Sequence, residues 1–294
     1  MKDTFTFDLE NAMDNLYKRG AFLTVGDKNK ANTMTITWGS VGFMWRKPMF
    51  MALVRESRYS SEFLGLDKTY TVSIPYTVTE IKANAFNGNS TIEEIEIQNK
   101  NGKGVTKIGE YAFANCGNLK SIVIPDSVTE VGRDTFLNCY SLKDVKLSKN
   151  IKEISYQMFY VCRSLEEIVI PDNVTTISAG AFSNCGNLRM ISLPTSLISI
   201  NDNVFSGSTK IEKIVIGKNA NFIFENGILL NKDKTKMFYI TDEILNKEVF
   251  EVPEGIDILR PNILSGNAIK KVKIPASVTN IENDFFPTSL EEIE

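Results

Sequence analysis

This 294-residue chain contains four cysteines, and their spacing indicates which chemistry they can perform. They stand 23 residues apart and are Cys116, Cys139, Cys162 and Cys185. Four thiolates could hold zinc, which needs sulfur ligands arranged as a tetrahedron around one point. In a repeating fold, however, equal spacing predicts a column with one cysteine per strand spacing of about 4.8 Å, spanning about 14 Å. We therefore interpret the four as small buried hydrophobic residues; a disulfide or a bound metal is the alternative.

The composition removes other kinds of chemistry. The chain has no histidine, which excludes Ser-His-Asp and Cys-His catalysis, histidine-containing zinc sites and the usual proton shuttle near neutral pH. It has 33 Lys and Arg against 36 Asp and Glu, with a net charge of -3. Binding to nucleic acid through counterion release is therefore not expected. We expect no catalytic and no metal-binding residue.

The cysteines belong to a repeat of 23 residues that fills most of the chain. A phenylalanine precedes each cysteine by three residues, and an aliphatic residue precedes each phenylalanine by five. The same offset recurs at Leu259 with Leu264 and at Ile281 with Phe286, which gives eight units. The six regularly spaced phenylalanines are Phe86, Phe113, Phe136, Phe159, Phe182 and Phe205. Such a period is typical of a solenoid, in which each unit packs against its neighbours.

One unit, residues 119–139, illustrates the expected local structure. Apolar residues alternate at Ile122 and Ile124, which predicts a short strand that Pro125 ends. Thr135 to Asn138 suits a short helical turn. A single unit buries too little apolar surface to offset the ordering of its backbone, so the units must stack and share a core. The predicted fold class is an α/β solenoid of short strands and short helical turns.

The repeat also resembles a known family. Residues 170–185 read Ile-Pro-Asp-Asn-Val-Thr-Thr-Ile-Ser-Ala-Gly-Ala-Phe-Ser-Asn-Cys. This phrase resembles the BspA-type leucine-rich repeats of bacterial surface proteins, over residues 68–294. Residues 226–237 resemble the hairpin that interrupts such arrays, so we expect an insertion near 219–247. The resemblance implies a leucine-rich-repeat solenoid that acts in adhesion or protein contact, and it implies no reaction.

Two residues of each strand are expected to face outward on the concave side of the solenoid. They change from acidic to mixed to basic along the array and contain no aromatic cluster. The positions are Glu94 and Glu96, Ser121 and Val123, Asp144 and Lys146, Glu167 and Val169, Met190 and Ser192, Lys213 and Val215, then Lys271 and Lys273. Such a face is either a solvated surface or the binding site of an unknown protein ligand.

Residues 1–67 do not fit the repeat and are predicted to form an α+β segment. A helix is expected from Asp8 to Gly20, which ends with cations and a glycine. Strands are expected over residues 21–25, 33–41 and 50–55. Turns are expected at Gly26-Asp27 and Lys47-Pro48.

Residues 20–25, 32–48 and 54–63 resemble the first half of flavin-reductase-like split barrels that bind FMN, although Thr37 and Ser60 depart from the family. Arginines and hydroxyls suit a phosphate. The cofactor-binding positions implied by the resemblance are Asn32, Thr33, Met34, Thr35, Trp38, Arg55, Ser57, Arg58 and Tyr59. Because the second half of the barrel is missing, no cofactor is expected. The alternative is an FMN-binding flavin-reductase-like protein, which the family implies would dimerise through this partial split barrel.

The sequence also bears on location. No stretch approaches the about 18 apolar residues of a membrane span, and the first residues contain no apolar run of signal-peptide length. This predicts a cytoplasmic protein. The resemblance to surface proteins implies the cell surface or secretion instead. Together these observations predict a non-catalytic protein-interaction or scaffold protein.

Overall fold

The computed structural model describes residues 21–26, 31–36, 39–44, 47–52, 70–217, 221–264 and 268–294. The chain forms two compact units, residues 1–69 and 70–294. The first contains two antiparallel pairs, which are β1 (Ala21–Gly26) with β2 (Ala31–Ile36) and β3 (Gly39–Met44) with β4 (Lys47–Ala52).

The predicted turn at Lys47-Pro48 is wrong. Lys47 and Pro48 lie in β4, opposite Met44 and Phe43 of β3. Proline is tolerated at the beginning of a strand and on an edge strand, so it is no evidence for a turn at this place. The expected helix over residues 8–20 lies outside the described residues.

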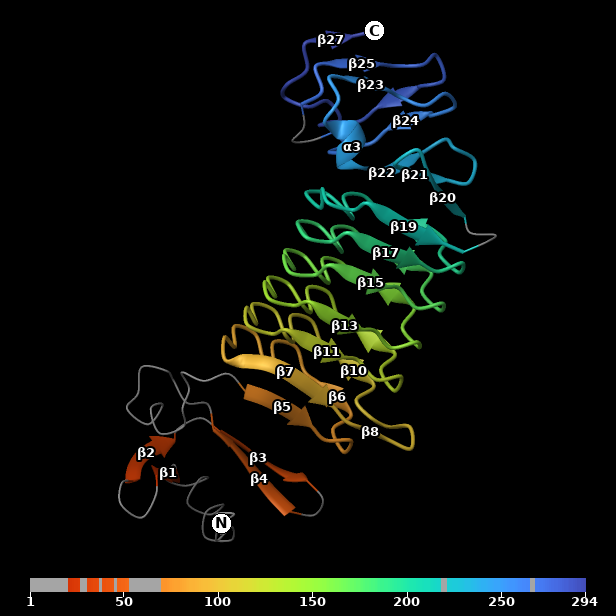
Figure 1. The fold of residues 1–294 in the computed structure, drawn as a ribbon. Helices are drawn as coiled ribbons and strands as arrows, with labels where there is room; N and C mark the ends of the chain where they lie inside the picture. The colour runs from red at the N-terminus through yellow and green to blue at the C-terminus, as the bar shows by residue number, and fades with distance from the viewer. Residues whose placement is uncertain are drawn as a thin grey trace. The chain divides into compact units, whose positions relative to one another are not determined.

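The second unit is a solenoid with two rows of short parallel strands (Figure 1). Most neighbouring strands of the longer row pair in steps of 23 residues, so that Met190 lies between Glu167 and Lys213. We call the solvent side of this row the strand face. The row consists of β5 (Tyr70–Ile74), β7 (Ile92–Ile97), β11 (Ser121–Val123), β13 (Asp144–Lys146), β15 (Glu167–Val169), β17 (Met190–Leu193) and β19 (Lys213–Ile216).

The second row contains strands of only two residues, because each coil turns sharply on either side of them. They pair in parallel with the same step, as in Thr176 with Glu153 and Ser199. The row consists of β6 (Glu80–Ile81), β10 (Lys107–Ile108), β12 (Glu130–Val131), β14 (Glu153–Ile154), β16 (Thr176–Ile177) and β18 (Ser199–Ile200).

The predicted helical turn of each repeat is wrong, because stacked non-helical turns form this side of the coil. Around Phe136 the backbone is left-handed at Asp134 (φ 56°) and Asn138 (φ 59°), a conformation that a right-handed helix cannot contain. The amide of Phe136 donates to the carbonyl oxygen of Met158, and that of Asn138 to Tyr160, both at 2.9 Å. Hydrogen bonds to the next coil thus replace those of a helix.

One repeat is longer than the others because it contains a small hairpin. Strands β8 (Asn99–Lys100) and β9 (Lys103–Gly104) pair across Asn101 and Gly102, both with positive φ. This is the favoured two-residue turn for antiparallel strands. The hairpin explains why Phe86 and Phe113 lie 27 residues apart.

A column of stacked phenylalanine rings forms the centre of the core. Phe113, Phe136, Phe159 and Phe182 are completely buried. Neighbouring ring centroids are 5.4 to 5.6 Å apart, with planes within 10° of parallel. These rings fill equivalent positions in successive coils, so each coil completes the core of the next.

Beyond Phe205 the column ends at an antiparallel sheet of β20 (Phe222–Glu225), β21 (Ile228–Asn231) and β22 (Met237–Ile240). The ring of Tyr239 contacts Phe205 edge-on at 5.7 Å, and its hydroxyl donates to the carbonyl oxygen of Ser208. Arg260 forms an ion pair with Asp202, which ties the following coil to the array.

The last coils have their own core. They follow α3 (Asp242–Leu245), the one helix in the part of the chain described here. The predicted core pair of Ile281 and Phe286 is wrong at its phenylalanine. Phe285 is buried in its place, whereas Phe286 is only partly buried and Ile281 is 45% exposed. The strands of these coils are β23 (Val249–Glu251), β24 (Ile258–Leu259), β25 (Lys271–Lys273), β26 (Asn280–Ile281) and β27 (Glu292–Ile293).

Candidate binding surface

The four cysteines lie inside the solenoid, at the same place in successive coils. All are completely buried within the main hydrophobic core, which confirms the predicted buried column. Each thiol donates to the carbonyl oxygen of a phenylalanine in the preceding coil, at 3.1 Å for Cys139 to Phe113 and 3.2 Å for Cys162 to Phe136. Ser208 makes the equivalent bond in the next coil. The position therefore selects a small donor that caps a buried carbonyl oxygen.

Burial also makes these thiols unreactive. It raises the pKa of Cys116 to about 11 and that of Cys185 to about 12, and it raises the pKa of Cys139 and Cys162 as well. Thiolate is the form that attacks electrophiles and binds metals. Within the described ranges, no group of three or more potential ligands could hold a metal ion. The cysteine column thus contributes packing and hydrogen bonding to the core.

On the strand face, the predicted outward positions are confirmed as exposed or half-buried. The alternating residues, such as Ile122 and Ile168, are buried. Three outward positions in alternate coils carry exposed valines, which are Val123 (53% exposed), Val169 (64%) and Val215 (39%). Single exposed apolar residues are ordinary on proteins. Three at one position of a regular sheet form a row, and this makes the strand face the best candidate for contact with another molecule.

Charges on β7, near the first end of the strand face, and on β25 in the last coils have partners within the chain. Glu94 and Glu96 accept hydrogen bonds from Thr71 (3.3 Å) and Ser73 (2.9 Å). In the last coils, Lys271 on β25 pairs with Glu292 at 2.9 Å, and Lys273 pairs with Glu251. These groups are already satisfied and have less to gain from a ligand.

The middle of the strand face carries three charges without such partners. Asp144 and Lys146 on β13 and Glu167 on β15 are exposed, and none has an ion-pair partner among residues 70–217 or in the other described ranges. The residues that precede these strands do pair, with Lys143 Nζ 3.2 Å from Glu166. Three charges at the centre of the strand face are therefore available to a partner.

The sheet itself is interrupted at this place. Strands β5, β7, β11 and β13 form one sheet, and β15, β17 and β19 form another. The second row is interrupted between the same two coils, because β12, which leads to β13, does not pair with β14, which leads to β15. The turn side stays closed, since the Phe136 and Phe159 rings are 5.4 Å apart. The two coils are thus joined along their turns and by side-chain hydrogen bonds, such as Ser155 Oγ to the carbonyl oxygen of Gly132 at 2.7 Å, but no backbone pairing joins their strands.

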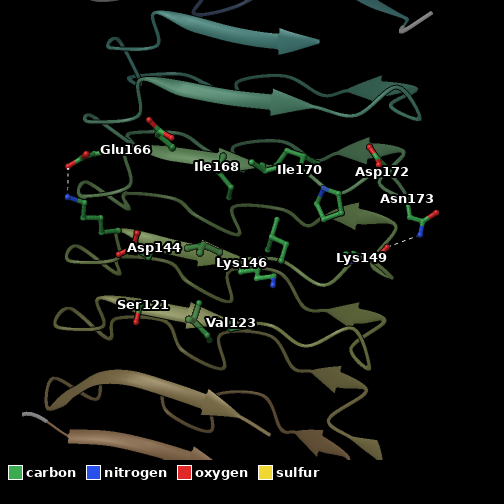
Figure 2. Close-up of a pocket in the computed structure, with 17 residues that line it drawn as sticks. Ser121, Val123, Asp144, Lys146, Lys149, Glu166, Ile168, Ile170, Asp172 and Asn173 are labelled. Atoms are coloured by element: carbon green, nitrogen blue, oxygen red, sulfur yellow. Dashed lines mark hydrogen bonds and ion pairs between the residues drawn. The ribbon is translucent and has the colours of Figure 1, made fainter. Parts of the chain in front are cut away.

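A groove of about 940 Å³ lies over this interruption on the strand face (Figure 2). Residues from β11, β13 and β15 line it, together with the segment after β15 that includes Asp172 and Asn173. The Asn173 side chain donates to the carbonyl oxygen of Lys149 at 2.8 Å, and the Lys143–Glu166 pair lies at the opposite end (Figure 2). Sequence reasoning did not find this groove, because the 23-residue spacing continues unchanged through it.

The residues implied by the flavin resemblance lie in the first unit. Asn32, Thr33, Met34 and Thr35 belong to β2, opposite Val25, Thr24, Leu23 and Phe22 of β1. Trp38, Arg55, Ser57, Arg58 and Tyr59 lie outside the described residues. An antiparallel pair such as β1 and β2 occurs in many folds and does not distinguish a flavin-binding barrel. The FMN site therefore stays a prediction.

Comparison with known proteins is informative for the repeats. A family described as the BspA type leucine rich repeat region matches residues 56–186, 106–236 and 234–294. A leucine rich cell surface protein from Faecalibacterium prausnitzii A2-165 is similar in structure, with TM-score 0.68, 24% identity and coverage of 95% of this chain and 76% of that one. No curated protein matches the sequence.

A leucine-rich repeat protein from Eubacterium ventriosum ATCC 27560 is also similar, with TM-score 0.59 and 20% identity over 93% of this chain and 68% of that one. These identities show a shared fold. Neither the family match nor these two structures support a flavin-reductase barrel in the first unit. In the described residues, no helix is long and apolar enough to cross a bilayer.

Proposed function

Because the chain belongs to the BspA-type leucine-rich repeat family, we propose that it is a non-catalytic protein whose strand face binds a protein partner. The observation that carries this proposal is the central part of that face, where exposed valines and unpaired charges surround a groove of about 940 Å³. A rigid stack of coils holds these side chains in fixed positions before binding. Such preorganisation lowers the entropy lost on association.

The experiment is site-specific photo-crosslinking with the full chain, expressed in the cells that carry its gene. A photoreactive amino acid replaces Glu96, Val169 or Val215 on the strand face. Tyr156, which is 45% exposed and belongs to a turn, serves as the control position. We expect one protein species to be captured from strand-face positions and not from Tyr156. Capture from all four positions alike, or from none, would contradict the proposal.

We also propose that the protein works at the cell surface or after secretion. The similar structure from Faecalibacterium prausnitzii is that of a cell surface protein, and adhesion is the role implied by the family. Protease treatment of intact cells checks this, since a surface protein is cleaved while a cytoplasmic marker stays intact. Complete protection of the chain in intact cells and its absence from the medium would support the cytoplasmic prediction instead.

Binding on the strand face needs no cofactor, no metal and no nucleic acid in this proposal. The FMN-binding alternative stays a prediction for the first unit, and titration with FMN tests it. Dimerisation through that unit is separately testable by light scattering, because the full chain would then have the mass of two chains and a variant of residues 70–294 the mass of one.

A further inference from the structure

We propose that the groove between β13 and β15 binds an extended segment of the protein partner, in which a basic and an acidic side chain stand two residues apart. The inference rests on the proposed function and makes it specific. In this proposal Asp144 and Glu167 bind the basic side chain of the segment, and Lys146 binds the acidic side chain. Four observations support it, which are unpaired backbone groups, unpaired charges, exposed valines and the length of the groove.

Backbone groups at the junction lack the partners that their equivalents have elsewhere. The amide of Lys143 donates to the carbonyl oxygen of Lys120 at 2.9 Å, and that of Arg189 donates to Glu166 at 2.8 Å. Within the described part of the strand face, no such bond joins Glu166 to Lys143. Backbone groups left without a protein partner take one from water or a ligand. An extended peptide offers donors and acceptors in alternation, which suits such a site.

The amide of Leu147 shows the same gap from the other strand. Its equivalent one coil earlier, Ile124, donates to the carbonyl oxygen of Lys146 at 2.8 Å, and the equivalent one coil later, Ile170, donates to Ser192 at 2.9 Å. In the part of the solenoid that the structure describes, Leu147 makes no corresponding bond to Val169. Leu147 lines the groove, so a bound segment could lie beside this amide.

The charges of the groove select the side chains of the segment. Asp144 and Glu167 occupy the same position in neighbouring coils, and both are exposed. Two neighbouring carboxylates without a counter-ion favour a cation between them. Lys146 lies two residues further along β13, about 7 Å from Asp144 at the rise of a strand. An extended segment has the same rise, so side chains two residues apart match this separation.

The exposed valines and the dimensions of the groove favour a peptide over a compact ligand. Val123 and Val169 stand on either side of Lys146, in the preceding and the following coil. A segment bound over Lys146 would cover apolar surface of these exposed valines. The groove extends from Lys143 and Glu166 to Lys149 and Asp172, which corresponds to about six residues of extended chain.

Selection of random displayed peptides of about ten residues on the full chain tests the inference. We expect enriched peptides to carry a basic and an acidic residue two positions apart. The double variant Asp144→Asn/Glu167→Gln and the single variant Lys146→Gln should each weaken their binding about tenfold. The matched control Glu212→Gln, an exposed carboxylate outside the groove, should leave it unchanged. Bound peptide should slow hydrogen exchange at Leu147 and Glu167.

Two results would overturn the inference, namely that no peptide is enriched, or that enriched peptides bind the Asp144/Glu167 and Lys146 variants as tightly as the unaltered chain. Neither result depends on the proposed function. Crosslinking from Glu96 or Val215, but not from Val169, would show a partner on the strand face away from the groove. Circular dichroism of each variant confirms folding, which is expected because all three side chains are exposed.

Discussion

Asn138 donates a side-chain hydrogen bond to Asn115 in the preceding coil, with Nδ2 and Oδ1 2.9 Å apart. Asn115 makes the same bond to Asn87 at 2.8 Å. The ladder stops at the next coil, where Val161 holds the position with φ 62°. A left-handed backbone costs a branched side chain about 1 to 2 kcal/mol, and asparagine tolerates it well.

Val161→Asn is therefore expected to stabilise the protein by about 1 kcal/mol. Relief of backbone strain and about 1 kcal/mol from a new side-chain hydrogen bond to Asn138 should outweigh about 1.5 kcal/mol of lost burial. Denaturant midpoints measure the change. Val169→Asn is the matched control, because Val169 is exposed and lies in a strand, and it should give no gain. A loss of stability in Val161→Asn would show that burial dominates at this position.

Phe159→Ala should cost about 3 to 5 kcal/mol, because it removes a completely buried ring from between Phe136 and Phe182. Phe286→Ala should cost less, since that ring is only partly buried. Urea unfolding of both variants decides the question. Equal losses would show that the last coil is as tightly packed as the middle.

The four thiols should react slowly with iodoacetamide in the native protein at pH 8 and quickly after denaturation. Burial keeps them protonated, since the pKa of Cys116 is raised from 9.0 to about 11. Because the folded pKa is the higher one, the unfolded chain releases protons first, and stability should be constant below about pH 9 and fall toward pH 11. Rapid labelling of all four thiols, or one zinc ion per chain by elemental analysis, would contradict the buried column.

Hydrogen exchange should detect the interruption between β13 and β15 without any ligand. A backbone hydrogen bond contributes about 1 kcal/mol, so the amide of Leu147 should exchange about fivefold faster than the amide of Ile124. Ile124 is the internal control, as the same position in the preceding coil. Equal protection at both amides would mean that the sheet is continuous in solution.

FMN should bind weakly or not at all, because flavin sites obtain much of their affinity from burial of the ring and the resemblance covers only half a barrel. Titration followed by flavin fluorescence measures it. Micromolar affinity that disappears in Arg55→Ala would establish the flavin site and restore the reductase-like alternative. No saturation by about 1 mM, which corresponds to about -4 kcal/mol, would agree with the expectation.

Much of the solenoid followed from local rules that repeat. The 23-residue period placed Phe113, Phe136 and Phe159 in one column, and the alternation at Ile122 and Ile124 separated the core from the strand face. These inferences succeeded because every coil meets the same neighbours, so a pattern in one unit describes the packing of all. The buried cysteines followed for the same reason.

The structure decided what depends on bonds between coils. Thr135 to Asn138 suits a helical turn when read alone, but amides that donate to the next coil impose left-handed turns instead. Phe285 rather than Phe286 fills the last core, a shift of one residue that the spacing of the repeat does not predict. The groove beside Asp144 and Glu167 arises where two coils lose their strand pairing, although the residue spacing stays constant. Sequence determines which side chains each coil presents, whereas the separation between coils is set by the packing of the whole stack.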